Sequence, residues 1–148
     1  MDKSRFNDQN KRLTEFQTEV VVSCPSCGKK AVAQAEYEAK KARLICSVCG
    51  YVKEASTETR ILGILGNWQI AAHHYFEAEL WLQASFKNDQ FWAYNYEHLE
   101  YLASYIGATL REHSERSHYT LLEKLPRFYH EAKNREPLLK VIDRLRRK

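Results

Sequence analysis

The sequence predicts an α+β fold in which a small antiparallel β module precedes a β-hairpin and several α-helices. Three observations predict it. Two Cys-x-x-Cys pairs near the N-terminus are flanked by β-branched and alternating segments. A second alternating stretch lies between residues 79 and 94, and apolar residues then recur at helical spacing towards the C-terminus. We therefore divide the chain into a polar lead-in (1–18), a cysteine module (19–56) and an aromatic-rich hairpin followed by a helical region (57–148).

The four cysteines form two pairs, Cys24 with Cys27 and Cys46 with Cys49, and eighteen residues separate the pairs. A two-residue gap lets one tight turn present two thiolates to the same tetrahedral ion, and the separation leaves room for two short strands. A glycine follows each pair, as a turn through positive φ requires. The pattern favours one structural Zn²⁺ ion in a Cys₄ zinc ribbon. Two disulfides, four unrelated thiols and a redox pair are the alternatives.

The elements of the cysteine module follow from its β-branched and alternating residues. Four strands are expected around the cysteine pairs, over residues 19–23, 30–36, 43–45 and 51–53. The connection over residues 36–41 lacks glycine and proline, so we expect a solvated hairpin tip there. Small polar residues and two glycines over residues 56–66 predict a hinge at the end of the module.

The spacing of apolar residues predicts the helices and strands of the rest of the chain. The expected elements are a helix over residues 67–78, a hairpin with strands over 79–86 and 91–94, and three helices over about 95–110, 120–133 and 134–148. Asn95 is an acceptable N-cap for the first of these three, and Pro126 predicts a kink in the second. The last is basic and is expected to bury Leu138, Ile142 and Leu145.

Charge and hydropathy narrow the class of protein. The net charge is +4 over 148 residues, with basic stretches at 20–60 and 111–148 and an acidic stretch at 61–110. No apolar run approaches the twenty or so residues that span a bilayer, and the polar start resembles neither a signal peptide nor an anchor. We expect a cytoplasmic protein with no membrane partner.

Eleven of the eighteen aromatic residues lie between Trp68 and Tyr105. Such density fits a core, a protein-binding surface or a platform for stacked bases, and the acidic charge of this stretch argues against bases. The residues predicted to bind a protein partner are Trp68, Tyr75, Trp81, Phe86, Trp92 and Tyr94.

The alternative is nucleic-acid binding through cations of the cysteine module and of the C-terminal helix. The module residues predicted to contact phosphate are Lys29, Lys30, Lys40, Lys41 and Arg43. A solvated helix face explains the C-terminal cations equally well. No nucleophile with a nearby base and no phosphate-binding loop is visible, so we do not expect an enzyme.

The segments CPSCG and CSVCG, with the hairpin between them, make residues 20–55 resemble the transcription-factor-B-type zinc ribbon. The remainder, notably WLQASF, FWAYNYEHLEYL and LPRFYHEAKNREPLLKVIDRLR, resembles small bacterial zinc-ribbon proteins, although residues 85–89 lack a cysteine pair that such proteins carry there. The resemblance implies a bacterial cytoplasmic protein and, from some proteins of this sort, an immunity protein for a secreted antibacterial nuclease toxin. The hypothesis is therefore a non-enzymatic inhibitor that covers the toxin's DNA-binding or active-site surface. A nucleic-acid-binding or transcription-related protein is the alternative.

Overall fold

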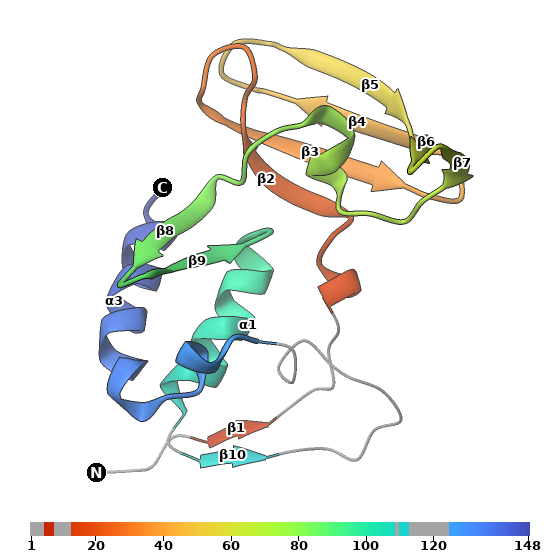
Figure 1. The fold of residues 1–148 in the computed structure, drawn as a ribbon. Coiled ribbons are helices and arrows are strands. Elements are labelled where there is room, and N and C mark those ends of the chain that lie inside the picture. Colours follow the sequence, from red (N-terminus) through yellow and green to blue (C-terminus); the bar gives the residue numbers. More distant parts are fainter. Residues whose placement is uncertain (1–4, 8–12, 109, 113–124) are drawn as a thin grey trace. The chain divides into compact units, whose positions relative to one another are not determined.

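The computed structural model describes residues 5–7, 13–108, 110–112 and 125–148 (Figure 1). Its contacts divide the chain into two compact units, each described here by itself. We call Phe16–Leu82 the sheet unit, and Met1–Glu15 together with Gln83–Lys148 the helical unit. Eight strands lie in antiparallel sheets and two α-helices lie in the described residues, so the α+β prediction is confirmed.

The sheet unit is built on a four-stranded antiparallel sheet with its strands in sequence order. The strands are β2 (Glu19–Ser23), β3 (Lys30–Glu36), β4 (Lys41–Ile45) and β5 (Val52–Ser56). All four were expected from the β-branched and alternating segments. The register aligns Val32, Ile45 and Val52 in one row across the outer face, while alternate positions such as Ala33 and Leu44 have no exposed surface.

The buried face of this sheet is covered by η2, a 3₁₀ turn over Ala72–Phe76. Its Ala72 and Phe76 side chains are buried. The first edge of the sheet is also covered, because main-chain groups of residues 79–81 pair with β2. The Ser23 N–H donates to the Glu79 carbonyl at 2.9 Å, and the Trp81 N–H donates to the Val21 carbonyl at 3.0 Å. The fold therefore leaves β5 as the other edge of the sheet.

The hinge predicted over residues 56–66 is wrong, because most of that segment forms a β-hairpin. Its strands are β6 (Glu58–Ile61) and β7 (Ile64–Asn67). The two residues between them, Leu62 and Gly63, both have positive φ, at 53° and 80°. A two-residue hairpin turn of type I′ needs this conformation, so the glycine serves a turn. The boundary between the two units falls instead between Leu82 and Gln83.

The helix predicted over residues 67–78 is also wrong. Only η2 is helical there: Ala71 before it is extended, and Glu77 after it has a φ of 51°. The apolar residues whose spacing of three and four suggested a helix make other contacts. The Tyr75 hydroxyl donates to the Trp68 carbonyl, and the Asn67 amide donates to the Tyr37 carbonyl at 2.9 Å. These contacts hold the segment against the sheet in a non-helical path.

In its described residues, the helical unit contains one hairpin, two α-helices and a short parallel pair. The elements are β8 (Leu82–Phe86), which starts at the unit boundary, β9 (Asp89–Ala93), α1 (Tyr96–Gly107), α3 (Arg135–Arg146), and β1 (Arg5–Asn7) paired with β10 (Leu110–Glu112). The described residues also form three 3₁₀ turns: η1 (Leu13–Glu15), η3 (Arg127–Tyr129) and η4 (Ala132–Asn134). The predicted hairpin and the first and last of the three C-terminal helices are confirmed. Neither α1 nor α3 is long and apolar enough to cross a membrane.

The two helices pack against each other and form the core of this unit (Figure 1). Asn95 caps α1 as predicted, since its side chain accepts the His98 N–H at 2.8 Å. Leu138, Ile142 and Leu145 of α3 are buried, also as predicted.

The helix expected over residues 120–133 is not found where the structure describes that segment. Residues 125–134 form η3 and η4, and residues 120–124 lie outside the described ranges. The rings of Phe128 and Tyr129, both in η3, pack on the β8–β9 hairpin. Phe128 stacks on Phe86 at 5.6 Å between ring centroids, and Tyr129 stacks on Phe91 at 5.4 Å. Pro126, directly before η3, has extended backbone with a φ of −55° and a ψ of 153°, so no α-helix continues through it. The prediction of several helices is thus reduced to two in the described residues.

Candidate metal centre

The four cysteines lie on two similar turns at one end of the four-stranded sheet. Cys24 directly follows β2, and Cys46 directly follows β4. In the first turn the Gly28 N–H donates to the Cys24 carbonyl at 2.9 Å, and in the second the Gly50 N–H donates to the Cys46 carbonyl at 3.0 Å. Both glycines have positive φ, at 75° and 81°. The repeated C-x-x-C-G sequence therefore builds the same local structure twice, on adjacent hairpins of one sheet.

The four sulfur atoms are spaced as ligands of one ion. Cys24 Sγ lies 3.7 Å from Cys49 Sγ, Cys27 Sγ lies 3.7 Å from Cys46 Sγ, and all four atoms lie within 4.8 Å of one another. A tetrahedral ion with bonds of about 2.3 Å separates its sulfur ligands by about 3.8 Å. A disulfide would require about 2.05 Å, and all four cysteines are free. The cluster could therefore hold one metal ion.

The electrostatics of the cluster favour a bound cation. The Cys46 pKa is lowered to about 7, first by the N–H of Cys49 and, against desolvation, also by that of Val48. The N–H of Lys29 lowers the pKa of Cys27, but desolvation and the neighbouring thiols outweigh it and raise that pKa to about 11. Four thiolates at this spacing repel one another unless a positive ion lies among them.

The six aromatic residues predicted to bind a partner are divided equally between the two units. Trp68, Tyr75 and Trp81 belong to the sheet unit, and Phe86, Trp92 and Tyr94 belong to the helical unit. Phe86 and Tyr94 are buried in the core of their unit, so the prediction is wrong for these two. The other four are half-buried. Trp68 also has a structural role, since its indole N–H donates to the Ile64 carbonyl at 3.3 Å and braces the β6–β7 hairpin.

A group of exposed aliphatic residues was missed from the sequence. In the described ranges, every exposed large apolar residue lies between positions 45 and 65: Ile45, Val48, Val52, Ile61, Leu62, Ile64 and Leu65. The most exposed is Leu62, at 97%, on the turn of the β6–β7 hairpin. The signal was present as the run RILGIL, but its glycine was interpreted as part of a hinge. We call Ile61, Leu62, Ile64 and Leu65 the aliphatic hairpin tip.

The predicted phosphate contacts are split between the two ends of the sheet. Lys29 and Lys30 lie at the cysteine end of β3, and Lys40 and Lys41 lie at the opposite hairpin. Seven strand residues separate the two ends by about 20 Å. The Lys40 ammonium pairs with Glu58 at 2.9 Å. The five cations therefore do not make one continuous basic patch, and Arg43 is itself paired with a carboxylate, that of Glu54, at 3.6 Å.

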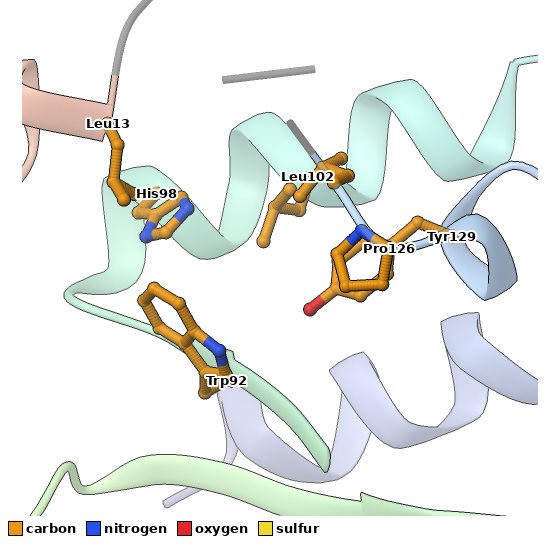
Figure 2. A pocket seen from close by; sticks show the side chains of 7 residues that line it. Leu13, Trp92, His98, Leu102, Pro126 and Tyr129 are labelled. Carbon is orange, nitrogen blue, oxygen red and sulfur yellow. The ribbon is translucent and has the colours of Figure 1, made fainter. Parts of the chain in front are cut away.

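A cavity in the helical unit offers no reactive group. It has a volume of about 90 Å³ and is lined by Leu13, Trp92, His98, Leu102, Leu125, Pro126 and Tyr129 (Figure 2). Ligand pockets are usually several times larger. The His98 ring accepts the Tyr94 N–H on Nδ1 at 3.0 Å, and burial lowers its pKa to about 4, so it is neutral at physiological pH. No carboxylate, thiol or lysine is among the lining residues.

Comparison with known proteins adds no relative: no family model, no curated protein and no solved structure matches this chain.

Proposed function

We propose that this chain is a non-enzymatic protein-binding module whose sheet unit is a zinc ribbon. The observation that carries the proposal is the aliphatic hairpin tip, in which Ile61, Leu62, Ile64 and Leu65 are all exposed within five consecutive residues. Clustered exposed aliphatic groups are characteristic of protein interaction sites. Fully burying one leucine side chain contributes about 1.5–3 kcal/mol, so a few such contacts are enough for a specific complex.

Zn²⁺ is the metal that we assign to the cluster, with one ion per chain. Four thiolates are the ligand set of structural zinc sites, and they leave no coordination position for water or substrate. The ion would thus hold the two cysteine turns together and perform no chemistry. Iron is the other metal that accepts four thiolates in a tetrahedron. Elemental analysis of the purified protein tests the assignment: about one zinc per chain is expected, and stoichiometric iron with a coloured protein would contradict it.

The more specific form of the proposal is an immunity-type inhibitor of an antibacterial nuclease in the bacterial cytoplasm. Two features support it. The stretch 61–110 is acidic, and acidic groups complement the DNA-binding cleft of a nuclease. The cations that would favour nucleic acid as the direct ligand are divided between two ends of the sheet and partly neutralised by Glu54 and Glu58. Such an inhibitor needs a binding surface and no active site.

Two matched variants test protein binding against nucleic-acid binding. Leu62→Asn removes the most exposed aliphatic side chain, and asparagine suits the positive φ of that turn position. Lys40→Asn places the same residue at a second position of positive φ, 57°, and removes a cation instead. We expect both variants to fold, because the Lys40–Glu58 pair is exposed and such pairs contribute little.

The assay is binding and growth rescue with the nuclease encoded beside this gene, together with low-salt binding to DNA and RNA. We expect Leu62→Asn to weaken the protein complex about tenfold or more and Lys40→Asn to leave it unchanged. The reverse result, salt-sensitive nucleic-acid binding that Lys40→Asn weakens, would establish the alternative. Rescue that never occurs with any neighbouring nuclease would refute the inhibitor form.

A further inference from the structure

The outer edge of β5 presents main-chain hydrogen-bonding groups at every second residue. The Cys46 N–H donates to the Tyr51 carbonyl at 2.8 Å, and the Thr57 N–H donates to the Lys40 carbonyl at 3.2 Å, so these positions face β4. The register between β4 and β5 continues this alternation. In an antiparallel pair, alternate residues direct both their N–H and C=O groups to opposite sides of the strand. Val52, Glu54 and Ser56 therefore direct theirs away from β4.

No described residue pairs with these three main-chain positions. The opposite edge of the same sheet is different, because residues 79–81 cover β2 with main-chain hydrogen bonds. Backbone of residues 79–81 thus closes one edge of the sheet, and no backbone among the described residues closes the β5 edge. These three residues each present one N–H donor and one C=O acceptor, at a spacing of two residues. An extended polypeptide backbone has the complementary groups at the same spacing.

A groove runs beside this edge on the η2 side. It has a volume of about 470 Å³ and lies between β5 and η2. Lys53 and Thr59 line it from the strand side, and His74, Tyr75 and Glu77 line it from η2. No β4 residue contributes to its walls, so the groove lies at the open side of the sheet. Alternate side chains of a strand added to β5 would enter this polar groove.

The other face of the same edge is apolar at one position and charged at the next. Val52 is 50% exposed and ends the row that begins with Val32 and Ile45. Glu54 lies two residues further along the same face, where it neighbours Arg43. An added strand would therefore place an apolar side chain beside Val52 and a basic side chain beside Glu54. Its residue between these two would face Lys53 and the groove.

Charge disfavours pairing of β5 with a second copy of itself in two of its antiparallel registers. In an antiparallel dimer centred on Glu54, two glutamates would face each other directly. A dimer centred on Lys53 would oppose two lysines at the closer, non-hydrogen-bonded spacing. Charges at these positions are a common protection of an edge strand against self-association. A different chain can instead place a basic residue beside Glu54, so the charges of this edge favour it over a second copy.

We propose that β5 binds an extended segment of a partner protein as an added strand, with an apolar residue beside Val52 and a basic residue beside Glu54. The inference rests on the proposed protein-binding function and names the form of the partner segment.

The test uses the full-length, metal-loaded chain and a phage-displayed library of random twelve-residue peptides. An enriched peptide is synthesised, and its binding is measured to the wild type and to two variants. Glu54→Pro removes an outward N–H without removing a hydrogen bond to β4, and proline is tolerated at such edge positions. Glu54→Thr is the matched control, because it removes the charge and keeps the N–H. Metal content and thermal melting verify that both variants fold.

We expect enriched peptides to carry an apolar and a basic residue two positions apart. Glu54→Pro should weaken binding about tenfold or more, and Glu54→Thr should weaken it less. Hydrogen exchange in the wild type supplies a readout that needs no variant: the peptide should protect the amides of Val52, Glu54 and Ser56.

Protection elsewhere, equal binding by the two variants, or no enriched peptide would overturn the proposal. A concentration-dependent dimer that Glu54→Pro abolishes would instead assign the edge to a second copy. If no peptide binds at β5 while Leu62→Asn still disrupts a protein complex, only the proposal of an added strand is refuted. If no protein complex forms at all, the proposed function fails with it.

Discussion

Removing the metal should unfold the sheet unit and leave the helical unit folded. The perturbation is a chelator of high zinc affinity added under reducing conditions to the full-length protein. The cysteine cluster joins the β2–β3 turn to the β4–β5 turn, so the ion links both hairpins of the sheet. The helical unit contains none of the four cysteines and has its own core in Leu99, Leu102, Ile142 and their neighbours.

The expected magnitude follows from the size and composition of the sheet unit. A unit of roughly 70 residues has a total stability of about 4–10 kcal/mol at the usual range per residue. Its buried sheet face is rich in small side chains, including Ala31, Ala33, Ala35 and Ala42, and each buries little apolar surface. A structural zinc site contributes about 10–16 kcal/mol at neutral pH. Loss of the ion therefore exceeds the whole stability of the unit.

Two signals separate the units in one sample. The sheet unit contains no α-helix, so helical ellipticity reports α1 and α3 of the helical unit. Trp68 and Trp81 lie in the sheet unit and Trp92 in the helical unit. In a Trp92→Phe variant, tryptophan fluorescence reports the sheet unit alone. On chelation we expect the fluorescence to shift to that of exposed indole while the helical ellipticity remains, and added Zn²⁺ to reverse the change.

One result would refute this reasoning. A metal-free protein whose tryptophan fluorescence and cooperative urea transition match those of the loaded protein would show that the alanine-rich sheet is stable without the ion. Simultaneous loss of helical ellipticity would contradict a narrower point, the independence of the helical unit.

Two further predictions concern α1. Asn95→Ala removes the cap that accepts the His98 N–H, and it should lower the free energy of unfolding of the helical unit by about 1 kcal/mol, measured by urea unfolding followed by helical ellipticity. Burial lowers the His98 pKa from 6.5 to about 4. Between pH 6.5 and pH 4 the imidazole therefore binds a proton in the unfolded chain but not in the folded chain. Stability should therefore fall as the pH decreases from 6.5 to 4, by up to about 3 kcal/mol, and His98→Gln should lose less over the same range in paired urea titrations.

The sequence was sufficient for the parts of the fold that local chemistry specifies. The cysteine spacing predicted the cluster, and the alternation of buried and exposed residues predicted the β2–β5 strands and the β8–β9 hairpin. Asn95 predicted the start of α1, because a capping side chain satisfies a free N–H wherever a helix begins. In each case the signal lies within a few residues of the element that it predicts.

The errors arose where tertiary contacts override a local pattern. Residues 67–78 have a helical spacing of apolar side chains, but those side chains contact the sheet and the hairpin from a non-helical backbone. Phe86 and Tyr94 were assigned to a partner surface, yet stacking on Phe128 and contact with His98 place them in the core. An aromatic residue suits both environments, so its identity alone does not distinguish them.

The stability that a metal would add at the cysteine cluster bears on the cost of the exposed aliphatic hairpin tip. Leu62 occupies a positive-φ position that disfavours a branched side chain, and its exposure contributes nothing to the stability of the free chain. In a unit with an alanine-rich core, the free energy of packing could not easily offset the conformational cost of Leu62. An ion bound by the four thiolates would offset it by a margin of several kcal/mol, because its binding free energy would act on the folded state as a whole. With a metal bound the tip would need no role in folding, and a leucine at a turn position that asparagine or glycine would fit better is what the proposed contact with a partner requires.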